Sequence, residues 1–244
     1  MSDSGAVLFA RYAYPPNELG YCGPAGADAL LRSDLPGEIG RRARGFEGAW
    51  AYLEYLGRSM GEPLDPAVVS AYWIGDTLPR SDFADLLGFL ESRFPGQHGG
   101  TWESAEGRAI PHHSFHVFEV YPWAALLRRT GHPTAASVLD RCRIRTGKIR
   151  AVRGETATVT NRPLVWDGST LAPGPVREEE VAWSVGGRSL LAGVAPGDRV
   201  ALHWDWICDV ITDAQAARIE SLEERQLRTL FPEKCRTPGL PSPA

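Results

Sequence analysis

The stretch Arg-Cys-Arg-Ile-Arg-Thr-Gly-Lys-Ile, residues 141–149, marks a change in the character of the sequence. Upstream, apolar residues recur at the three-to-four-residue spacing of helices. Downstream, short alternating or β-branched segments are separated by turn signals. Cys142 lies at this seam between two arginines, whose positive charge would favour its thiolate form. We therefore expect a helical domain over residues 1–140 and a second domain over residues 141–232.

The helical domain is expected to consist of amphipathic helices joined by loops rich in glycine and proline. Asp65 and Ser81 are candidate N-caps, and Pro122 is expected to break or kink a later helix. The spacing predicts helices over residues 37–61, 65–76, 81–96, 113–132 and 132–142.

The second domain reads as short strands spaced about ten residues apart, which is typical of a small barrel. The expected strands lie within residues 143–154, 155–168, 175–187, 188–194 and 198–211. A final helix is expected from Thr212 or Asp213, and the tail 233–244 is expected to be disordered. The predicted fold class is α+β: an all-α N-terminal domain followed by a small OB-like β-barrel with a C-terminal helix.

Bulk composition excludes several classes of function. A net charge of −4 leaves no basic excess to neutralise phosphates, which argues against nucleic-acid binding. No apolar run approaches the roughly 18–20 residues that span a bilayer, and the N-terminus lacks a signal peptide, so we expect no membrane partner and a cytoplasmic location. The four cysteines form no Cys-x-x-Cys pair, which suggests neither a zinc ribbon nor a disulfide framework.

Residues 109–123 contain the densest set of candidate metal ligands. His112 and His116 are four residues apart and would share one face of a helix, as would His113 and His116 at three residues apart. Such pairs can ligate zinc or iron, and Glu119 could hold one ring from behind. The alternative is that Pro111 keeps the first two histidines in a loop and that most of these rings are structural.

Cys22 is a second candidate thiol. It precedes Gly-Pro-Ala-Gly and an expected helix start, where the helix dipole would lower its pKa. A cysteine at a helix N-terminus with a distant histidine can be a nucleophile. The alternative is a small residue that packs a turn.

His203 lies in a strand expected over residues 198–211. On a continuous strand His203 and Asp205 would face the same way, so Asp205 could orient the imidazole or act as a further ligand. The alternative is a hydrogen-bonded core histidine.

The second domain resembles the small nickel–iron hydrogenase maturation chaperones of the HypC/HupF family. The resemblance covers about residues 142–230 and rests on the order of three motifs and a terminal acidic helix. These motifs are Cys142 with Gly147-Lys148-Ile149, then Pro196-Gly197-Asp198-Arg-Val200, and then His203. It differs in that Thr146 stands where the family has proline and in the Trp-Asp-Trp that follows His203.

The resemblance implies that Cys142 and His203 are ligands of an iron that carries cyanide and carbon monoxide. Arg141, Arg143 and Arg145 would then lower the pKa of the thiol and face the anionic iron–cyanide group. In the family the cysteine is N-terminal, whereas Cys142 is internal and has no free amine. Any third ligand must therefore come from elsewhere in the chain.

These observations favour a metallocentre-assembly protein that binds or delivers an iron fragment, with a hydrogenase large subunit or another maturation protein as partner. A metal- or thiol-dependent enzyme is the alternative. Its site would lie between the domains and use Cys22 or Cys142 with His112, His113 or His116. A third reading is a binding module without chemistry.

Overall fold

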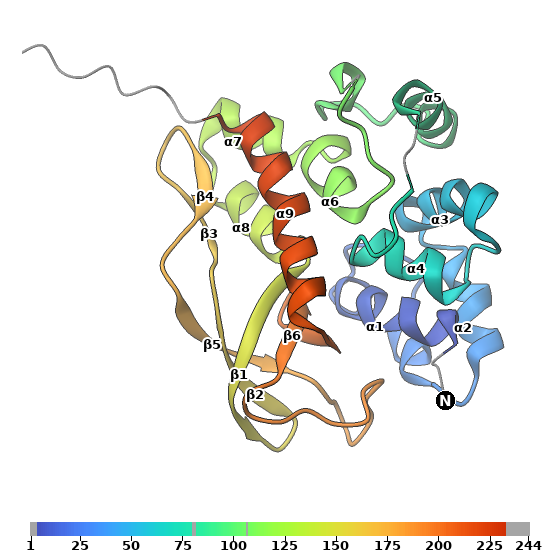
Figure 1. Ribbon diagram of the computed structural model, residues 1–244, viewed down its shortest axis with the longest axis vertical. Helices are drawn as coiled ribbons and strands as arrows, with labels where there is room; N and C mark the ends of the chain where they lie inside the picture. Colours follow the sequence, from blue (N-terminus) through green and yellow to red (C-terminus); the bar gives the residue numbers. More distant parts are fainter. Residues whose placement is uncertain (1–3, 80–81, 106, 233–244) are drawn as a thin grey trace, which may run out of the picture.

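The structure is a computed structural model that describes residues 4–79, 82–105 and 107–232. Helices fill the N-terminal part, a β-barrel follows, and a long helix closes the chain (Figure 1). This arrangement confirms the predicted α+β class. The helices before the barrel are α1 (Gly5–Glu18), α2 (Pro36–Ala43), α3 (Glu47–Met60), α4 (Pro66–Trp73), α5 (Phe83–Arg93), α6 (His113–Phe115), α7 (Trp123–Thr130) and α8 (Pro133–Cys142).

The N-terminal helices differ from the expected ones in three respects. Helix α1 was not expected; it contains Pro15 and Pro16 near its C-terminal end, and both are buried. The expected helix over residues 37–61 is divided into α2 and α3. Ser81 lies outside the described residues, and Asp82 caps α5 by accepting hydrogen bonds from the backbone N–H groups of Ala84 and Asp85.

Pro122 ends a helical segment, as expected. The segment begins with α6, continues as a π-helical turn, η3 (His116–Val120), and resumes after Pro122 as α7. A π-helical turn admits one extra residue per turn and is frequent at functional sites.

The barrel is closed by five strands in the order β1, β2, β5, β7, β6. All neighbours are antiparallel except β5 and β7, and a separate hairpin, β3–β4, lies outside the barrel. The strands are β1 (Arg145–Arg153), β2 (Thr156–Asn161), β3 (Leu164–Trp166), β4 (Leu171–Pro173), β5 (Arg177–Ala182), β6 (Arg199–His203) and β7 (Trp206–Val210).

Three expectations about the strands are wrong. The segment 155–168 forms two strands, β2 in the barrel and β3 in the separate hairpin. Residues 188–194 form no strand and contribute one isolated bridge, between Val185 and Arg188. The segment 198–211 is a hairpin rather than one strand, because the chain turns at Trp204 and Asp205 and pairs His203 with Trp206. Trp204 adopts a left-handed backbone conformation, with φ of 53°, which permits the tight turn.

The terminal helix α9 (Asp213–Leu230) begins with a capping box. The hydroxyl of Thr212 accepts a hydrogen bond from the backbone N–H of Gln215, whose side chain accepts one from the N–H of Thr212. The helix crosses between the barrel side of the molecule and the N-terminal helices (Figure 1). The tail 233–244, expected to be disordered, lies outside the described residues.

Replacing Thr212 with alanine is expected to lower the free energy of unfolding by about 1 kcal/mol, because it leaves the first N–H groups of α9 without their acceptor. Urea unfolding measures the change. Thr229→Ala, at an exposed position of the same helix, is the control and should change stability by less than about 0.5 kcal/mol. Equal losses in the two variants would contradict the capping role of Thr212.

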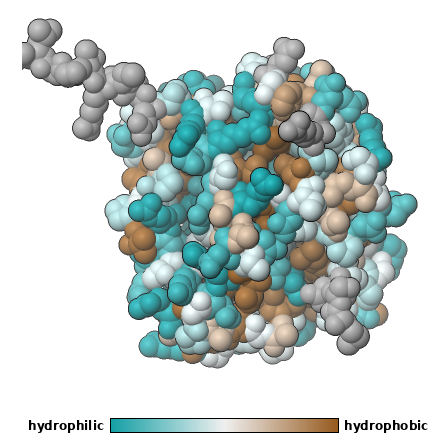
Figure 2. Space-filling model, in the orientation of Figure 1, coloured by the Kyte–Doolittle hydropathy of each residue, from teal (hydrophilic) through white to brown (hydrophobic). Residues whose placement is uncertain are grey.

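The helical part and the barrel share one hydrophobic cluster. It joins side chains of α1, α3 and α4 to Ala201 and Trp206 of the barrel and to Ile219 of α9. On the face shown in Figure 2, hydrophilic side chains predominate and apolar atoms are visible between α9 and the N-terminal helices. No helix in the described part of the chain is long and apolar enough to cross a membrane.

Candidate metal centre

Three residues with metal-binding side chains meet where the helical part joins the barrel. His113 is the first residue of α6, Cys142 the last of α8 and His203 the last of β6. One ligand atom from each lies within 4.8 Å of the others, and all three residues are buried. Within the described residues, this is the one grouping of three or more histidine, cysteine or carboxylate side chains at such distances. We call it the His–Cys–His cluster.

The end of α8 explains why these residues meet. The last carbonyl groups of a helix have no partner within the helix. The carbonyl of Arg141 accepts a hydrogen bond from the backbone N–H of Trp204 at 2.8 Å, and the carbonyl of Cys142 accepts one from Nε2 of His113 at 2.8 Å. The C-terminus of α8 therefore fixes both the β6–β7 turn and the α6 histidine around Cys142.

Hydrogen bonds to backbone carbonyl groups fix the tautomers of both His113 and His203. Nδ1 of His203 lies 2.7 Å from the carbonyl oxygen of Tyr12, which can only accept, so Nδ1 carries the proton and Nε2 keeps its lone pair. That Nε2 has no partner among the described residues. For the same reason His113 keeps its lone pair on Nδ1, 3.2 Å from the hydroxyl of Tyr72. Metal-bound histidines commonly donate their second ring N–H to a carbonyl in this way.

Burial keeps the cluster uncharged when no metal is bound. It lowers the pKa of His113 to about 4 and holds the pKa of His203 well below its ordinary value. Burial also raises the pKa of the Cys142 thiol. The lone pair on Nε2 of His203 is ready to bind a metal, whereas Nδ1 of His113 must first give up its hydrogen bond from the Tyr72 hydroxyl and the thiol must lose its proton. The donors are thus two nitrogens and, after deprotonation, one sulfur.

A cavity of about 370 Å³ adjoins the cluster. All three cluster residues line it, together with His116 and Cys22. None of the described residues that line it is an aspartate, glutamate, lysine or arginine. The others are Pro16, Tyr21, Phe46, Gly48, Ala49, Tyr72, Trp73, Gln97, Tyr121, Pro122, Trp123, Val138 and Trp204.

The histidine-rich segment contributes one cluster residue and one cavity residue. His113 and His116, three residues apart, both line the cavity, whereas His112 does not. His112 is instead the N-cap of α6, and its Nδ1 accepts a hydrogen bond from the backbone N–H of Ser114 at 3.0 Å. The expected pairing of His112 with His116 on one helical face is therefore wrong, because the helix begins only after His112.

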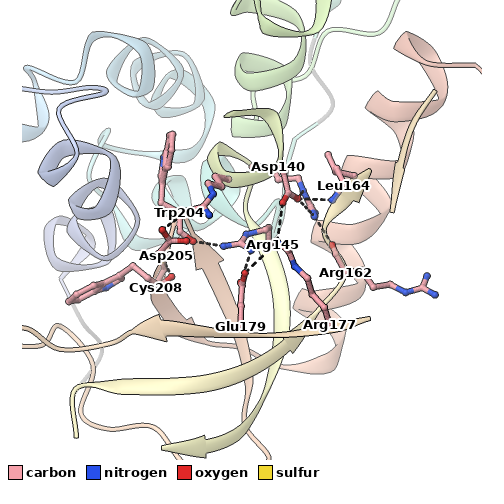
Figure 3. A network of polar contacts seen from close by, with 12 residues as sticks. Asp140, Arg145, Arg162, Leu164, Arg177, Glu179, Trp204, Asp205 and Cys208 are labelled. Atoms are coloured by element: carbon pink, nitrogen blue, oxygen red, sulfur yellow. Dashed lines mark hydrogen bonds and ion pairs between the residues drawn. The ribbon is translucent and has the colours of Figure 1, made fainter. Parts of the chain in front are cut away.

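The predicted role of the three arginines is not supported. Arg141 pairs with Asp205; Arg143 pairs with Glu223 and, at 3.0 Å, with Asp140. Arg145 bonds to Glu179 at 2.6 Å and donates to the carbonyl of Trp204 (Figure 3). The charges of the three arginines are paired with carboxylates, and the pKa of the Cys142 thiol is raised rather than lowered. They hold the turn and the end of α8 in place.

Glu119 and Asp205, which were expected to orient histidine rings, bond to other residues. The buried carboxylate of Glu119 accepts hydrogen bonds from Thr101 and, at 2.8 Å, from Nε of Arg108, so it does not orient an imidazole. Asp205 lies in the hairpin turn and pairs with the exposed Arg141. It does not lie beside His203, because the strand on which that prediction rests ends at His203.

Cys22 lies in the cavity wall but not at a helix N-terminus. It falls in a bend at residues 21–23, ahead of the short turn Ala27–Leu31. Burial raises the pKa of its thiol to about 12, which is the reverse of the predicted shift. Asn17 fixes this bend by donating hydrogen bonds to the carbonyls of Cys22 and Pro24 at 2.7 and 2.9 Å.

The groups that support the cluster were not predicted from the sequence. Tyr72 contacts His113 through its hydroxyl, and Trp73 packs 4.7 Å from the His113 ring. Both residues lie in the apolar helix α4, where the sequence pattern predicts core packing and gives no indication of a contact with a histidine. Tyr12 acts through its backbone carbonyl, which any residue could supply, so no sequence signal could have identified it.

Acidification is expected to destabilise the metal-free protein. Burial lowers the pKa of His112 from 6.5 to about 3. Between these values the unfolded chain binds more protons than the folded one, so stability that is present above pH 6.5 is lost as the pH falls. At pH 5 this histidine alone would cost about 2 kcal/mol.

Urea unfolding at pH 7 and pH 5 measures the effect of His112. The variant His112→Asn keeps an N-cap side chain and should lose about 2 kcal/mol less than the wild type on acidification. His98→Asn, at an exposed position, should behave as the wild type does. An equal acid-induced loss in His112→Asn and the wild type would contradict the assignment.

Fold and site together define a class: an α+β protein in which a helical region and a five-stranded barrel enclose a buried His–Cys–His cluster. A family model described as a family of unknown function, DUF6390, matches residues 1–235, so the chain belongs to that family. No match is found among the curated proteins or among the solved structures.

Proposed function

We propose that this protein is a HypC-like accessory protein of metallocentre assembly. It would bind an iron fragment with cyanide and carbonyl ligands through Cys142, His203 and His113. A hydrogenase large subunit or another maturation protein would supply or receive this fragment. The observation that carries the proposal is the meeting of Cys142 with His203. The resemblance selects these two residues by motif alone, and they lie far apart in the sequence.

His113 supplies what an internal cysteine lacks. With no α-amine available at Cys142, a third donor must come from another part of the chain, and His113 comes from the helical part. One thiolate with two imidazoles suits iron as well as zinc. The choice of iron therefore rests on the resemblance to the HypC/HupF family.

The adjoining cavity favours a metal that keeps ligands of its own. Its volume of about 370 Å³ is many times the roughly 30 Å³ that one water molecule occupies in the liquid. A purely structural metal site is normally closed by four protein ligands, whereas an open position facing a cavity suits a metal that carries or exchanges small ligands.

Infrared spectroscopy of protein produced without oxygen, together with the hydrogenase maturation proteins, tests the proposal. Cyanide and carbonyl stretching bands should accompany the wild type and be absent from Cys142→Ser. The matched control is Cys208→Ser, because Cys208 is also buried but does not line the cavity. Absence of bands from the wild type, or equal bands in Cys142→Ser, would refute the proposal.

A thiol-dependent enzyme is the second candidate. The presence of Cys22, Cys142, His113 and His116 around one cavity favours it. The raised pKa of both thiols opposes it, because a nucleophilic cysteine needs a stabilised thiolate. Rapid labelling of one of these thiols by iodoacetamide at neutral pH would support an enzyme, and slow labelling of both would count against it.

A further inference from the structure

Besides the cluster residue His203, three residues around the cavity have nitrogen atoms that lack partners among the described residues. The indole Nε1 of Trp73, the indole Nε1 of Trp204 and both ring nitrogens of His116 are buried without a hydrogen-bond partner among the described residues. The three side chains are 3, 5 and 4 % exposed. A buried donor left unsatisfied costs about 1–3 kcal/mol, so three such residues at one site require an explanation.

These residues share the cavity with the His–Cys–His cluster. The ring of Trp73 lies 4.7 Å from that of His113 and 5.8 Å from that of His203. Trp204 directly follows His203, and His116 follows His113 by one helical turn. All three line the same cavity as the cluster. The residues that carry the unpartnered nitrogens therefore line the space next to the candidate metal.

The chemistry of the cavity selects the class of ligand. The cavity wall carries no aspartate, glutamate, lysine or arginine among the described residues, so no side-chain cation is available to neutralise a free anion. A metal at the cluster would supply that charge. Indole groups only donate hydrogen bonds, and a neutral imidazole has one donor and one acceptor. The space fits a small anion that binds the metal at one end and accepts hydrogen bonds at the other.

We propose that His116, with Trp73 and Trp204, forms a hydrogen-bonding site for small linear anions of the cyanide and azide class that bind the metal at the cluster. This inference rests on the proposed metal site. It adds a role for three residues that are not themselves ligands: they hold and orient the outer atom of a metal-bound anion, and His116 is the principal donor.

Packing fixes the imidazole of His116 for this role. Its ring lies 4.3 Å from the ring of Tyr121 and 5.4 Å from that of Tyr52. On the other side it packs against Gly48 of α3, where an added Cβ would lie 2.7 Å from Nε2. Gly48 thus leaves room for the ring, and Gly48→Ala would displace the ring without removing it.

Cobalt(II) and azide provide the test. The cobalt-loaded wild type is titrated with azide while the absorption of the metal is recorded. His116→Phe should leave cobalt affinity unchanged and weaken azide binding about tenfold, as expected for the loss of one hydrogen bond. Gly48→Ala should also weaken azide binding. Trp123→Phe is the control, because Trp123 lines the cavity but its nitrogen is not among the buried unpartnered atoms.

The outcomes separate this inference from the proposed function. If cobalt binds but azide does not bind the wild type, or binds His116→Phe equally well, the inference is wrong and the metal site stands. If His116→Phe abolishes cobalt binding, His116 is a ligand and the inference is again wrong. If the wild type takes up no cobalt, both the metal site and the inference are wrong.

Discussion

Replacing Cys142 with serine is expected to lower the affinity of the protein for iron by more than about 100-fold. Mutation of residues that hydrogen-bond to metal ligands typically lowers metal affinity by about 10- to 100-fold, and the loss of a ligand itself should exceed that range. Cys142 provides the only sulfur of the cluster, and its thiolate is the only donor that would bring negative charge. His113→Gln and His203→Gln should weaken binding for the same reason.

Competition with a chelator of known affinity, under anaerobic conditions, measures this loss. Cys208→Ser makes the same change of atom at a buried position outside the cavity and should bind iron as the wild type does. His98→Gln provides the corresponding control at an exposed histidine. If Cys142→Ser kept wild-type affinity, or if Cys208→Ser lost as much, the cluster would not be the binding site.

Replacing Arg143 with methionine is expected to lower the free energy of unfolding by about 3–5 kcal/mol. The change would leave the buried carboxylates of Asp140 and Glu223 without a cation. Arg143 is 5 % exposed and bonds to Asp140 and Glu223, which are 6 and 7 % exposed. Asp140 also accepts a hydrogen bond from the backbone N–H of Leu164 at 2.7 Å. The network thus ties the last turn of α8 to β3 and α9.

The exposed pair of Arg228 and Glu224 on α9 provides the control. Arg228→Met should cost no more than about 1 kcal/mol, as is usual for surface ion pairs. Urea unfolding of the metal-free protein measures both variants. Equal small losses would contradict a structural role for Arg143, and would reopen the prediction that it acts on a ligand at the cluster.

The sequence was most informative where local patterns govern the structure. The change of periodicity at Cys142 coincides with the end of α8 and the start of the barrel, and Pro122 does break a helix. The capping motif at Thr212 opens α9, as expected. The hairpin within residues 198–211 was missed, because its turn residues, Trp204 and Asp205, carry no glycine or asparagine signal.

The surroundings of the cluster depend on long-range packing, which local patterns do not encode. The segment 112–116 offers three histidines, but only tertiary structure decides that His113 joins Cys142 while His112 caps α6. The carboxylates that pair with the arginines beside Cys142 include Glu179 and Glu223, which are distant in the sequence. Burial likewise reverses the predicted pKa shifts of both cavity thiols.

X-ray absorption spectroscopy at the iron edge, on protein loaded with iron without oxygen, is the decisive measurement for the metal centre. We expect one sulfur and two imidazole nitrogens among the nearest neighbours of iron in the wild type. The sulfur should disappear in Cys142→Ser and persist in Cys208→Ser. A spectrum without a sulfur neighbour, or one that Cys142→Ser leaves unchanged, would contradict the assignment of Cys142, His113 and His203 as the metal centre.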